Sequence, residues 1–352
     1  MFRFIALTSN RKILINPLIG VDNTIIQLID LNDDIKDKLK ISYLNETYTN
    51  TNLFQWSCKN GHLEVAKWLV KTFDDIDVHA DYEYAFRSSC SNDRLEVAKW
   101  LIKTFNNIDV HVDNEDVFRW NCGNGHLEVA KWLIETFDDI GVHAENDHAF
   151  RWSCESGHLG VAKWLVETFD DIDVHAKNEE AFRYSCSHGH LEVVKWLVET
   201  FDDIDVHAEN EEAFILSCVH GYLEIAKWLF ETFGDIDVHA NNDEAFRYSC
   251  SYGHLEIVKW LVKTFDDIDV HIHNEEAFRR SCETGQLEVA KLLITIIPDI
   301  RQNNDNYLKI ANDSARYNLT EYICDQSPYY KCEYKDGKPI GYTIKEYINI
   351  KR

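Results

Sequence analysis

Apolar and polar positions recur along this chain with a fixed period of 32 residues. In each period a short apolar stretch around a Phe and a Cys comes first, and a longer amphipathic stretch that begins at a Leu follows. The period is kept by eight cysteines: Cys58, Cys90, Cys122, Cys154, Cys186, Cys218, Cys250 and Cys282. A fixed period of this length is typical of stacked repeat proteins. We therefore predict one elongated array rather than separate globular domains.

The copy over residues 178–208, NEEAFRYSCSHGHLEVVKWLVETFDDIDVHA, illustrates the elements that we expect. Asn178 is predicted to be the N-cap of a short first helix over 181–187, because its side chain can accept from free amides of the first turn. Gly189 suits a left-handed turn, and a second helix should follow over 191–201. The apolar residues of this second helix cover a wide arc, which suits a helix covered by neighbouring copies. The predicted fold is all-α, a solenoid of stacked helix-turn-helix repeats.

The stretch AFRYSCSHGHLEVVKWLVE resembles the ankyrin repeat, whose pattern is roughly TPLHLAAxxGHLEVVKLLLE followed by GADVNA. The match is direct from Gly189 to Lys195 and at Leu197, and residues 204–208 are similar to the DVNA hairpin segment. The VHA ending and the near-identical copies most resemble ankyrin-repeat proteins of mimivirus-type giant viruses. Two departures are clear: EAFR replaces TPLH, and Phe-Asp-Asp replaces the glycine after the second helix in most copies. The first removes the Thr and His of the family's inter-repeat hydrogen bonds, and the second leaves a shorter hairpin tip.

The pattern divides the chain into four parts. Residues 1–49 are predicted to be an N-terminal cap or a degenerate half-repeat, because 24–35 faintly echoes the end of a second helix. Residues 50–298 hold eight repeats, and 299–326 keep the skeleton of a degenerate ninth that would act as the C-terminal cap. In the tail, 327–352, apolar residues alternate around Asp336-Gly337, which predicts a β-hairpin that serves as a capping element or a docking segment.

The formal charge of −25 comes from the repeats, since residues 51–298 hold 21 basic and 47 acidic side chains, a net −26. This balance argues against nucleic acid and anionic membranes as partners, because both require neutralising Lys and Arg. It fits either a basic partner protein or solvated loops that keep the array soluble. No apolar run is long enough for a membrane span or a signal-peptide core. We expect a soluble monomer in the cytoplasm, the host cytoplasm if the protein is viral.

No constellation for catalysis, a cofactor or a metal is expected. Equivalent cysteines of stacked helices should lie roughly 8–10 Å apart, beyond the reach of a disulfide, so they are interpreted as core thiols of a reducing compartment. Each copy supplies one thiol and one loop imidazole, too few for zinc, and a ladder of equal units lacks the unlike groups of an active site. The Trp that recurs in each second helix is interpreted as inter-repeat packing.

A column of histidines lies where the resemblance places a hairpin Asn, and backbone hydrogen bonding is its expected role. A pH-sensitive ladder is the alternative, since histidine titrates near neutrality. The column comprises His79, His111, His143, His175, His207, His239 and His271.

Some positions vary among the copies while the scaffold positions do not. They are the two residues before the Gly-His turn, the connection tips, and a first-helix position that carries Trp, Tyr, Leu, Ser or Arg. The resemblance places the first two classes on the concave binding face, although freedom from packing would produce the same variability. Aromatic residues at these positions would make good anchors for a partner. The candidate protein-binding residues are Tyr82, Tyr84, Trp120, His148, Trp152, Tyr184, His188, His220, Tyr248 and Tyr252.

These observations favour a non-catalytic protein–protein interaction scaffold, acting on a host protein if the viral resemblance holds. The alternative is an adaptor that links a bound target to a degradation or signalling complex through its terminal segments. An enzyme or metalloprotein is the third hypothesis.

Overall fold

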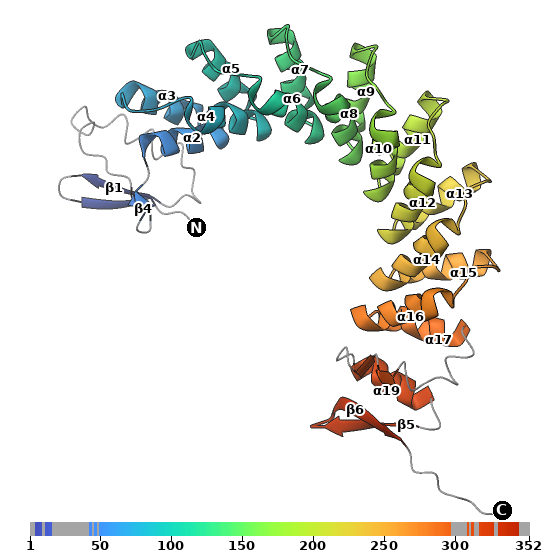
Figure 1. Cartoon of the computed structure of the whole chain (residues 1–352). Helices are drawn as coiled ribbons and strands as arrows, with labels where there is room; N and C mark the ends of the chain where they lie inside the picture. Colours follow the sequence, from blue (N-terminus) through green and yellow to red (C-terminus); the bar gives the residue numbers. More distant parts are fainter. Residues whose placement is uncertain are drawn as a thin grey trace, which may run out of the picture. The chain divides into compact units, whose positions relative to one another are not determined.

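The structure, a computed structural model, describes residues 4–8, 11–15, 42–43, 46–47, 49–296, 308–309, 311–312, 317–326 and 330–344 (Figure 1). Residues 49–296 form eight helix pairs, one for each 32-residue copy. The first helices of the pairs are α2 (Asn50–Lys59), α4 (Ala80–Ser91), α6 (Val112–Gly123), α8 (Ala144–Glu155), α10 (Ala176–Ser187), α12 (Ala208–Val219), α14 (Ala240–Tyr252) and α16 (Ile272–Thr284). The second helices are α3 (Leu63–Thr72), α5 (Leu95–Thr104), α7 (Leu127–Thr136), α9 (Leu159–Thr168), α11 (Leu191–Thr200), α13 (Leu223–Thr232), α15 (Leu255–Thr264) and α17 (Leu287–Ile296).

The chain divides into two units, each of which is described by itself. Unit 1 comprises residues 1–153 and 160–173, and unit 2 comprises residues 154–159 and 174–352. In unit 1 the first helices α2, α4 and α6 pack side by side, and in unit 2 α10, α12, α14 and α16 do the same (Figure 1). The predicted stack of helix-turn-helix repeats is confirmed.

The core repeats with the copies. The Phe and the Cys of each first helix are fully buried, as at Phe182 and Cys186. The Trp of a second helix packs edge-on against the Phe in the first helix of the preceding copy, with ring centroids 6.3 Å apart for Trp100 and Phe54. The recurring Trp residues therefore join neighbouring copies, as predicted. Removing one of these Phe rings would cost about 3–5 kcal/mol, because the stack cannot close the cavity.

All ten cysteines are free and buried. Burial raises the pKa of the Cys186 thiol well above its ordinary value, because the thiolate would lose its hydration. In unit 2 the carbonyl of Cys154 accepts a hydrogen bond from the Ser185 hydroxyl at 3.0 Å. The cysteine column is part of the packed core, as expected.

The turn between the two helices of a copy has the predicted conformation. Gly189 has φ +83°, and the amide of His190 donates to the carbonyl of Ser185 at 2.9 Å. A Cβ at Gly189 would lie 2.3 Å from the Tyr222 ring, so this position also requires glycine because a larger residue would clash with Tyr222. In the second copy Asp93 replaces the glycine and adopts φ +57°.

The connection from one copy to the next differs from expectation. Lys177, Asn178 and Glu179 are all left-handed, with φ of 57°, 56° and 61°, so the prediction of Asn178 as an N-cap is wrong. Residues 49–296 contain no β-strand, so the hairpin implied by the ankyrin resemblance does not form there. The connection is too short for two strands and reverses through a three-residue left-handed turn instead. Such a conformation costs about 1–2 kcal/mol per non-glycine residue, so other contacts must offset it.

Strands occur at both ends of the described chain. The N-terminal strands β1 (Phe4–Thr8), β2 (Arg11–Ile15), β3 (Ser42–Tyr43) and β4 (Glu46–Thr47) form an antiparallel sheet in the order β2-β1-β3-β4. The sequence did not predict these strands, and segment 24–35, expected as part of a half-repeat, lies outside the described residues.

The C-terminal tail forms the predicted hairpin. Strands β5 (Tyr330–Lys335) and β6 (Lys338–Ile344) pair antiparallel around Asp336-Gly337 and pack on helix α19 (Tyr317–Gln326). Of the expected ninth repeat, residues 308–309 and 311–312 are also helical.

Candidate functional site

The candidate residues lie on first helices, on the left-handed turns within them, or at the residue that directly follows a first helix, as His188 and His220 do. We call this surface the first-helix face of each unit: the exposed and half-buried side chains of the first helices, of these turns and of the residue that follows each first helix. Unit 1 carries Tyr82, Tyr84, Trp120, His148 and Trp152, and unit 2 carries Tyr184, His188, His220, Tyr248 and Tyr252.

In unit 1 two Trp rings meet on this face. Trp120, on α6, is 42% exposed and lies edge-on to Trp152 of α8, with centroids 5.0 Å apart. The ring of His148 lies 5.2 Å from that of Trp152, and Nη1 of Arg119 lies 3.4 Å from Nδ1 of His148. A Cβ on Gly123 would lie 2.2 Å from the Trp152 ring, so this glycine lets the ring rest on the α6 backbone. The result is a partly exposed aromatic cluster.

The connecting turn supplies the remaining unit 1 candidates. Tyr82 is left-handed and 78% exposed, and Tyr84 is half-buried. Within the described part of the chain no ring contact joins either residue to the Trp cluster.

In unit 2 two Tyr rings meet on helix α14. Tyr252 is 56% exposed and stacks on Tyr248, with centroids 6.2 Å apart. The Arg280 guanidinium lies 5.0 Å from the Tyr248 centroid, within cation–π range. Its Nε donates to Oε1 of Glu276 at 2.6 Å. This face thus already holds one arginine between an aromatic ring and a carboxylate.

The other unit 2 candidates lie at the ends of first helices. Nδ1 of His188 is 2.9 Å from the carbonyl oxygen of Tyr184, and Nδ1 of His220 is 3.0 Å from that of Leu216. Nδ1 therefore carries the proton and donates to a carbonyl that the end of the helix leaves free. Both imidazoles are exposed, and these bonds fix their orientation.

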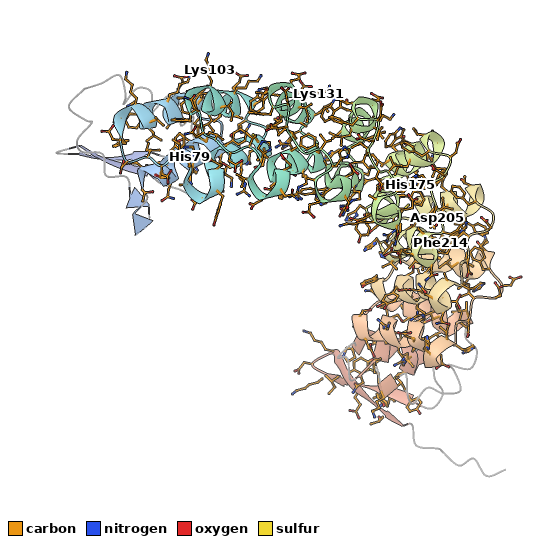
Figure 2. All side chains as sticks on the ribbon, turned by 45° about the horizontal axis from the view of Figure 1, so that its top comes forward. His79, Lys103, Lys131, His175, Asp205 and Phe214 are labelled. Atoms are coloured by element: carbon orange, nitrogen blue, oxygen red, sulfur yellow. The ribbon has the colours of Figure 1, made fainter. Side chains whose placement is uncertain are left out.

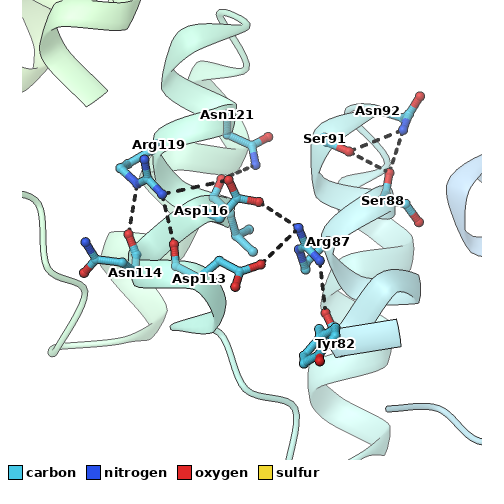
Figure 3. Close-up of polar contacts among 11 residues, drawn as sticks. Tyr82, Arg87, Ser88, Ser91, Asn92, Asp113, Asn114, Asp116, Arg119 and Asn121 are labelled. Atoms are coloured by element: carbon cyan, nitrogen blue, oxygen red, sulfur yellow. Dashed lines mark hydrogen bonds and ion pairs between the residues drawn. The ribbon is translucent and has the colours of Figure 1, made fainter. Parts of the chain in front are cut away.

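An arginine on the first helix holds the left-handed turn, and the sequence analysis missed this role. Arg183 is buried; its Nε donates to the carbonyl of Asn178 at 2.6 Å, and its Nη2 donates to that of Lys177 at 2.9 Å. Figure 3 shows the same arrangement in unit 1, where Arg119 donates to the carbonyls of Asn114 and Asp113, both at 2.9 Å. We call these residues clamp arginines. The arginine is the last residue of EAFR and stands where the ankyrin pattern TPLH has its His, so it supplies hydrogen bonds from that position.

The signal for the clamp was present in the sequence, because the arginine keeps the period. Six copies carry it: Arg87, Arg119, Arg151, Arg183, Arg247 and Arg279. In the sixth copy Ile215 takes its place and is buried, although Glu209, Asn210 and Glu211 before it are left-handed like the others.

The histidine column bonds to carboxylates, which corrects the expectation of backbone hydrogen bonding. In six copies Nδ1 lies between 2.6 and 2.8 Å from a carboxylate four residues later, as in His79 with Glu83 and His175 with Glu179. Figure 2 labels His79 in unit 1 and His175 in unit 2. The left-handed turn places that acid under the imidazole, and the acid is buried. In five copies Nε2 lies 3.2–3.5 Å from an Asp of the next copy.

At His111 and His207 these contacts favour the charged imidazolium. The hydrogen bond that His111 donates to Glu115 raises the pKa of His111, and the one that His207 donates to Glu211 raises the pKa of His207. Burial opposes both shifts, and Coulomb attraction from nearby carboxylates adds to them. Each such His therefore links its own turn to the next copy. Among the described residues no group of three or more His, Cys, Asp or Glu is arranged to hold a metal ion.

A comparison with protein families matches this chain. The family described as "Ankyrin repeats (3 copies)" matches at residues 88–178, 118–210, 170–242 and 214–304, which together cover more than half of the chain. Among solved structures, the crystal structure of the human ASB11 ankyrin repeat domain is 17% identical, with 60% of this chain and 97% of that chain covered and a TM-score of 0.46. The search of curated proteins found no match. None of the helices in the described ranges has the length and apolarity needed to cross a bilayer.

Proposed function

Since the chain belongs to the ankyrin-repeat family, we propose that it is a non-catalytic scaffold that binds a partner protein through its first-helix face. Ankyrin repeats generally mediate protein–protein interactions. The family supports binding as the class of function, and the surface chemistry of this chain supports the choice of face.

The observation that carries the proposal is the exposure of large aromatic side chains on the first helices. The scaffold Phe residues are fully buried, whereas Trp120 and Tyr252 are 42% and 56% exposed on the same helices. Trp, Tyr and Arg are enriched among the residues that dominate binding energy at protein interfaces. Exposed rings that are already fixed by neighbouring rings also lose little entropy on binding.

The charge of the repeats supports a basic partner. With 21 basic and 47 acidic side chains over 51–298, the array attracts positively charged surfaces and repels nucleic acid. We propose that the protein acts as a monomer in the cytoplasm. If the resemblance to giant-virus repeat proteins reflects its origin, the partner is a host protein.

The adaptor alternative needs a terminal segment that recruits a second complex. The described part of the tail, residues 330–344, is a hairpin packed on α19, which supports a capping role. We therefore propose the scaffold alone.

The test is affinity purification with the wild-type chain and with the triple variant Trp152→Ala, Tyr184→Ala and Tyr248→Ala. The matched control is Glu192→Ala, Glu224→Ala and Glu256→Ala, three exposed acids on second helices. Circular dichroism and urea unfolding check that both variants remain folded. We expect the first variant to lose the partner and the control to keep it. Retention of the partner by the folded first variant would overturn the proposed face.

A further inference from the structure

Three of the clamp arginines, Arg87, Arg183 and Arg247, also pair with an acid on the following first helix. Nη2 of Arg87 lies 3.0 Å from Oδ2 of Asp116, as Figure 3 shows. In unit 2 Arg183 pairs with Glu212, and Nη1 of Arg247 lies 2.7 Å from Oε2 of Glu276. The acid follows its arginine by 29 residues in all three pairs, so the pairing has the same spacing in both units.

In unit 2 one acid at the corresponding position lacks its arginine. By the same spacing Glu244 should pair with residue 215, and that residue is Ile. Glu244 is half-buried on α14, and within the described part of the chain it has no hydrogen-bond or ion-pair partner. A carboxylate that has lost part of its hydration without gaining a cation is costly, and an incoming positive charge would offset that cost.

The neighbouring copy shows how such a charge is held. Glu276 accepts from both Arg247 and Arg280, and the Arg280 guanidinium lies over the Tyr248 ring. Tyr248 lies four residues after Glu244 on α14, so the two side chains are neighbours on the same side of the helix. Leu216, one period before Tyr248, presents a half-buried apolar side chain on the adjacent α12.

We propose that Glu244, with Leu216 and Tyr248 beside it, receives an arginine side chain of the partner protein; this inference rests on the proposed function. The guanidinium takes the place that a clamp arginine occupies in other copies, and its aliphatic stem lies against apolar side chains. Arginine fits better than lysine, because its planar fork binds a carboxylate through two N–H groups and also stacks on tyrosine. The net −26 of the repeats favours the approach of a basic segment over an acidic one.

The site can be tested with a small probe on the full-length chain. N-acetyl-argininamide is titrated while the ring signals of 13C-labelled Tyr248 and Tyr252 are followed by NMR. N-acetyl-citrullinamide, which has the same shape without the charge, is the control ligand. We expect saturable shifts with the arginine derivative and binding at least about tenfold weaker with the citrulline derivative, as expected for loss of a charged hydrogen bond.

Three variants separate this site from general charge attraction. Ile215→Arg restores the clamp arginine, which would itself pair with Glu244 and block the site. Glu244→Gln removes the carboxylate. Each change should weaken probe binding by about tenfold or more. Glu212→Gln is the matched control, because Arg183 already occupies that acid, and it should leave the titration unchanged. Equal shifts with both ligands, or titrations that Glu244→Gln and Ile215→Arg do not alter, would overturn the arginine site.

The two proposals fail in different ways. If the probe does not bind but the triple aromatic variant loses the partner, the arginine site is wrong and the scaffold function stands. If the triple variant keeps the partner, the proposed face is wrong even where the probe binds.

Discussion

Replacing one clamp arginine by the residue found in the sixth copy tests how the left-handed turns are stabilised. The change is Arg183→Ile, which copies the natural situation at Ile215. Arg183 is 8% exposed and donates to two turn carbonyls, at 2.6 and 2.9 Å, besides its pair with Glu212. Hydrogen bonds from a charged donor contribute about 1.5–3 kcal/mol each. Burial of the Ile side chain returns about 1.5–3 kcal/mol. We therefore expect a net loss of about 1–3 kcal/mol.

The reverse change, Ile215→Arg, should stabilise the sixth copy, because it adds the two carbonyl bonds and a partner for Glu244. Arg94→Ile is the control, since Arg94 is exposed and replaces the His of the Gly-His turn in the second copy. We expect it to change the free energy of unfolding by no more than about 0.5 kcal/mol. The assay is urea unfolding followed by circular dichroism, with hydrogen exchange at residues 177–179 as a local readout. Repeat arrays can unfold in parts, which broadens the urea transition. If that happens, hydrogen exchange at residues 177–179 decides whether the turn is destabilised. An unchanged or higher midpoint for Arg183→Ile, with unchanged exchange at the turn, would refute the clamp.

Three further predictions follow from local geometry. Because Glu211 raises the pKa of His207, the stability that this contact contributes should be full below about pH 6.5 and lost as pH rises through the raised pKa. The difference in urea-unfolding midpoint between wild type and His207→Gln should therefore shrink from about pH 6 to pH 8.5. A difference that grows over this range would contradict the prediction. Gly189→Ala should destabilise by at least about 1 kcal/mol in urea unfolding, since φ is +83° and the new Cβ would meet Tyr222. Gly160→Ala, with nothing near its Cβ in helix α9, should stabilise by up to about 1 kcal/mol. The ten buried thiols should react with a thiol reagent such as DTNB only on unfolding, and prompt reaction of several in native buffer would show that the core assignment is wrong.

Most of the stack could be predicted from the sequence, because its causes are local or periodic. The spacing of Phe182, Cys186 and Leu191 is enough to place two helices and a turn, and the glycine at 189 marks the left-handed residue between them. The Trp packing follows from the period, since a large side chain in every second helix must lie against the next copy. The C-terminal hairpin follows from alternation around Asp336-Gly337.

The connection could not be predicted, because its residues suit two structures. Asn followed by acids is typical of a helix start, and Asn is also among the residues that best tolerate a left-handed backbone. Arg183 stabilises the left-handed turn by bonding to the carbonyls of residues five and six positions earlier, although the turn before Ile215 forms without such a bond. The same turn brings Glu179 under His175, which explains why the role expected for the histidines was wrong.

The candidate face could be predicted only as classes of position. Sequence variation among copies pointed to Trp120 and Tyr252, and the structure adds which rings touch and which are exposed. The departure at Ile215 was visible in the sequence. Its consequence for Glu244 was not, because the pairing of positions 29 residues apart requires the observed register of the helices.

The most direct test of the proposed function is hydroxyl-radical footprinting of the chain with and without its purified partner. Oxidation of Trp120 and Tyr252 reports the first-helix face, and Tyr334, 52% exposed on the hairpin, is the internal control. We predict that the partner lowers oxidation at Tyr252, at Trp120 or at both, and leaves Tyr334 unchanged. Unchanged oxidation at both first-helix residues, with protection at Tyr334, would contradict binding through this face.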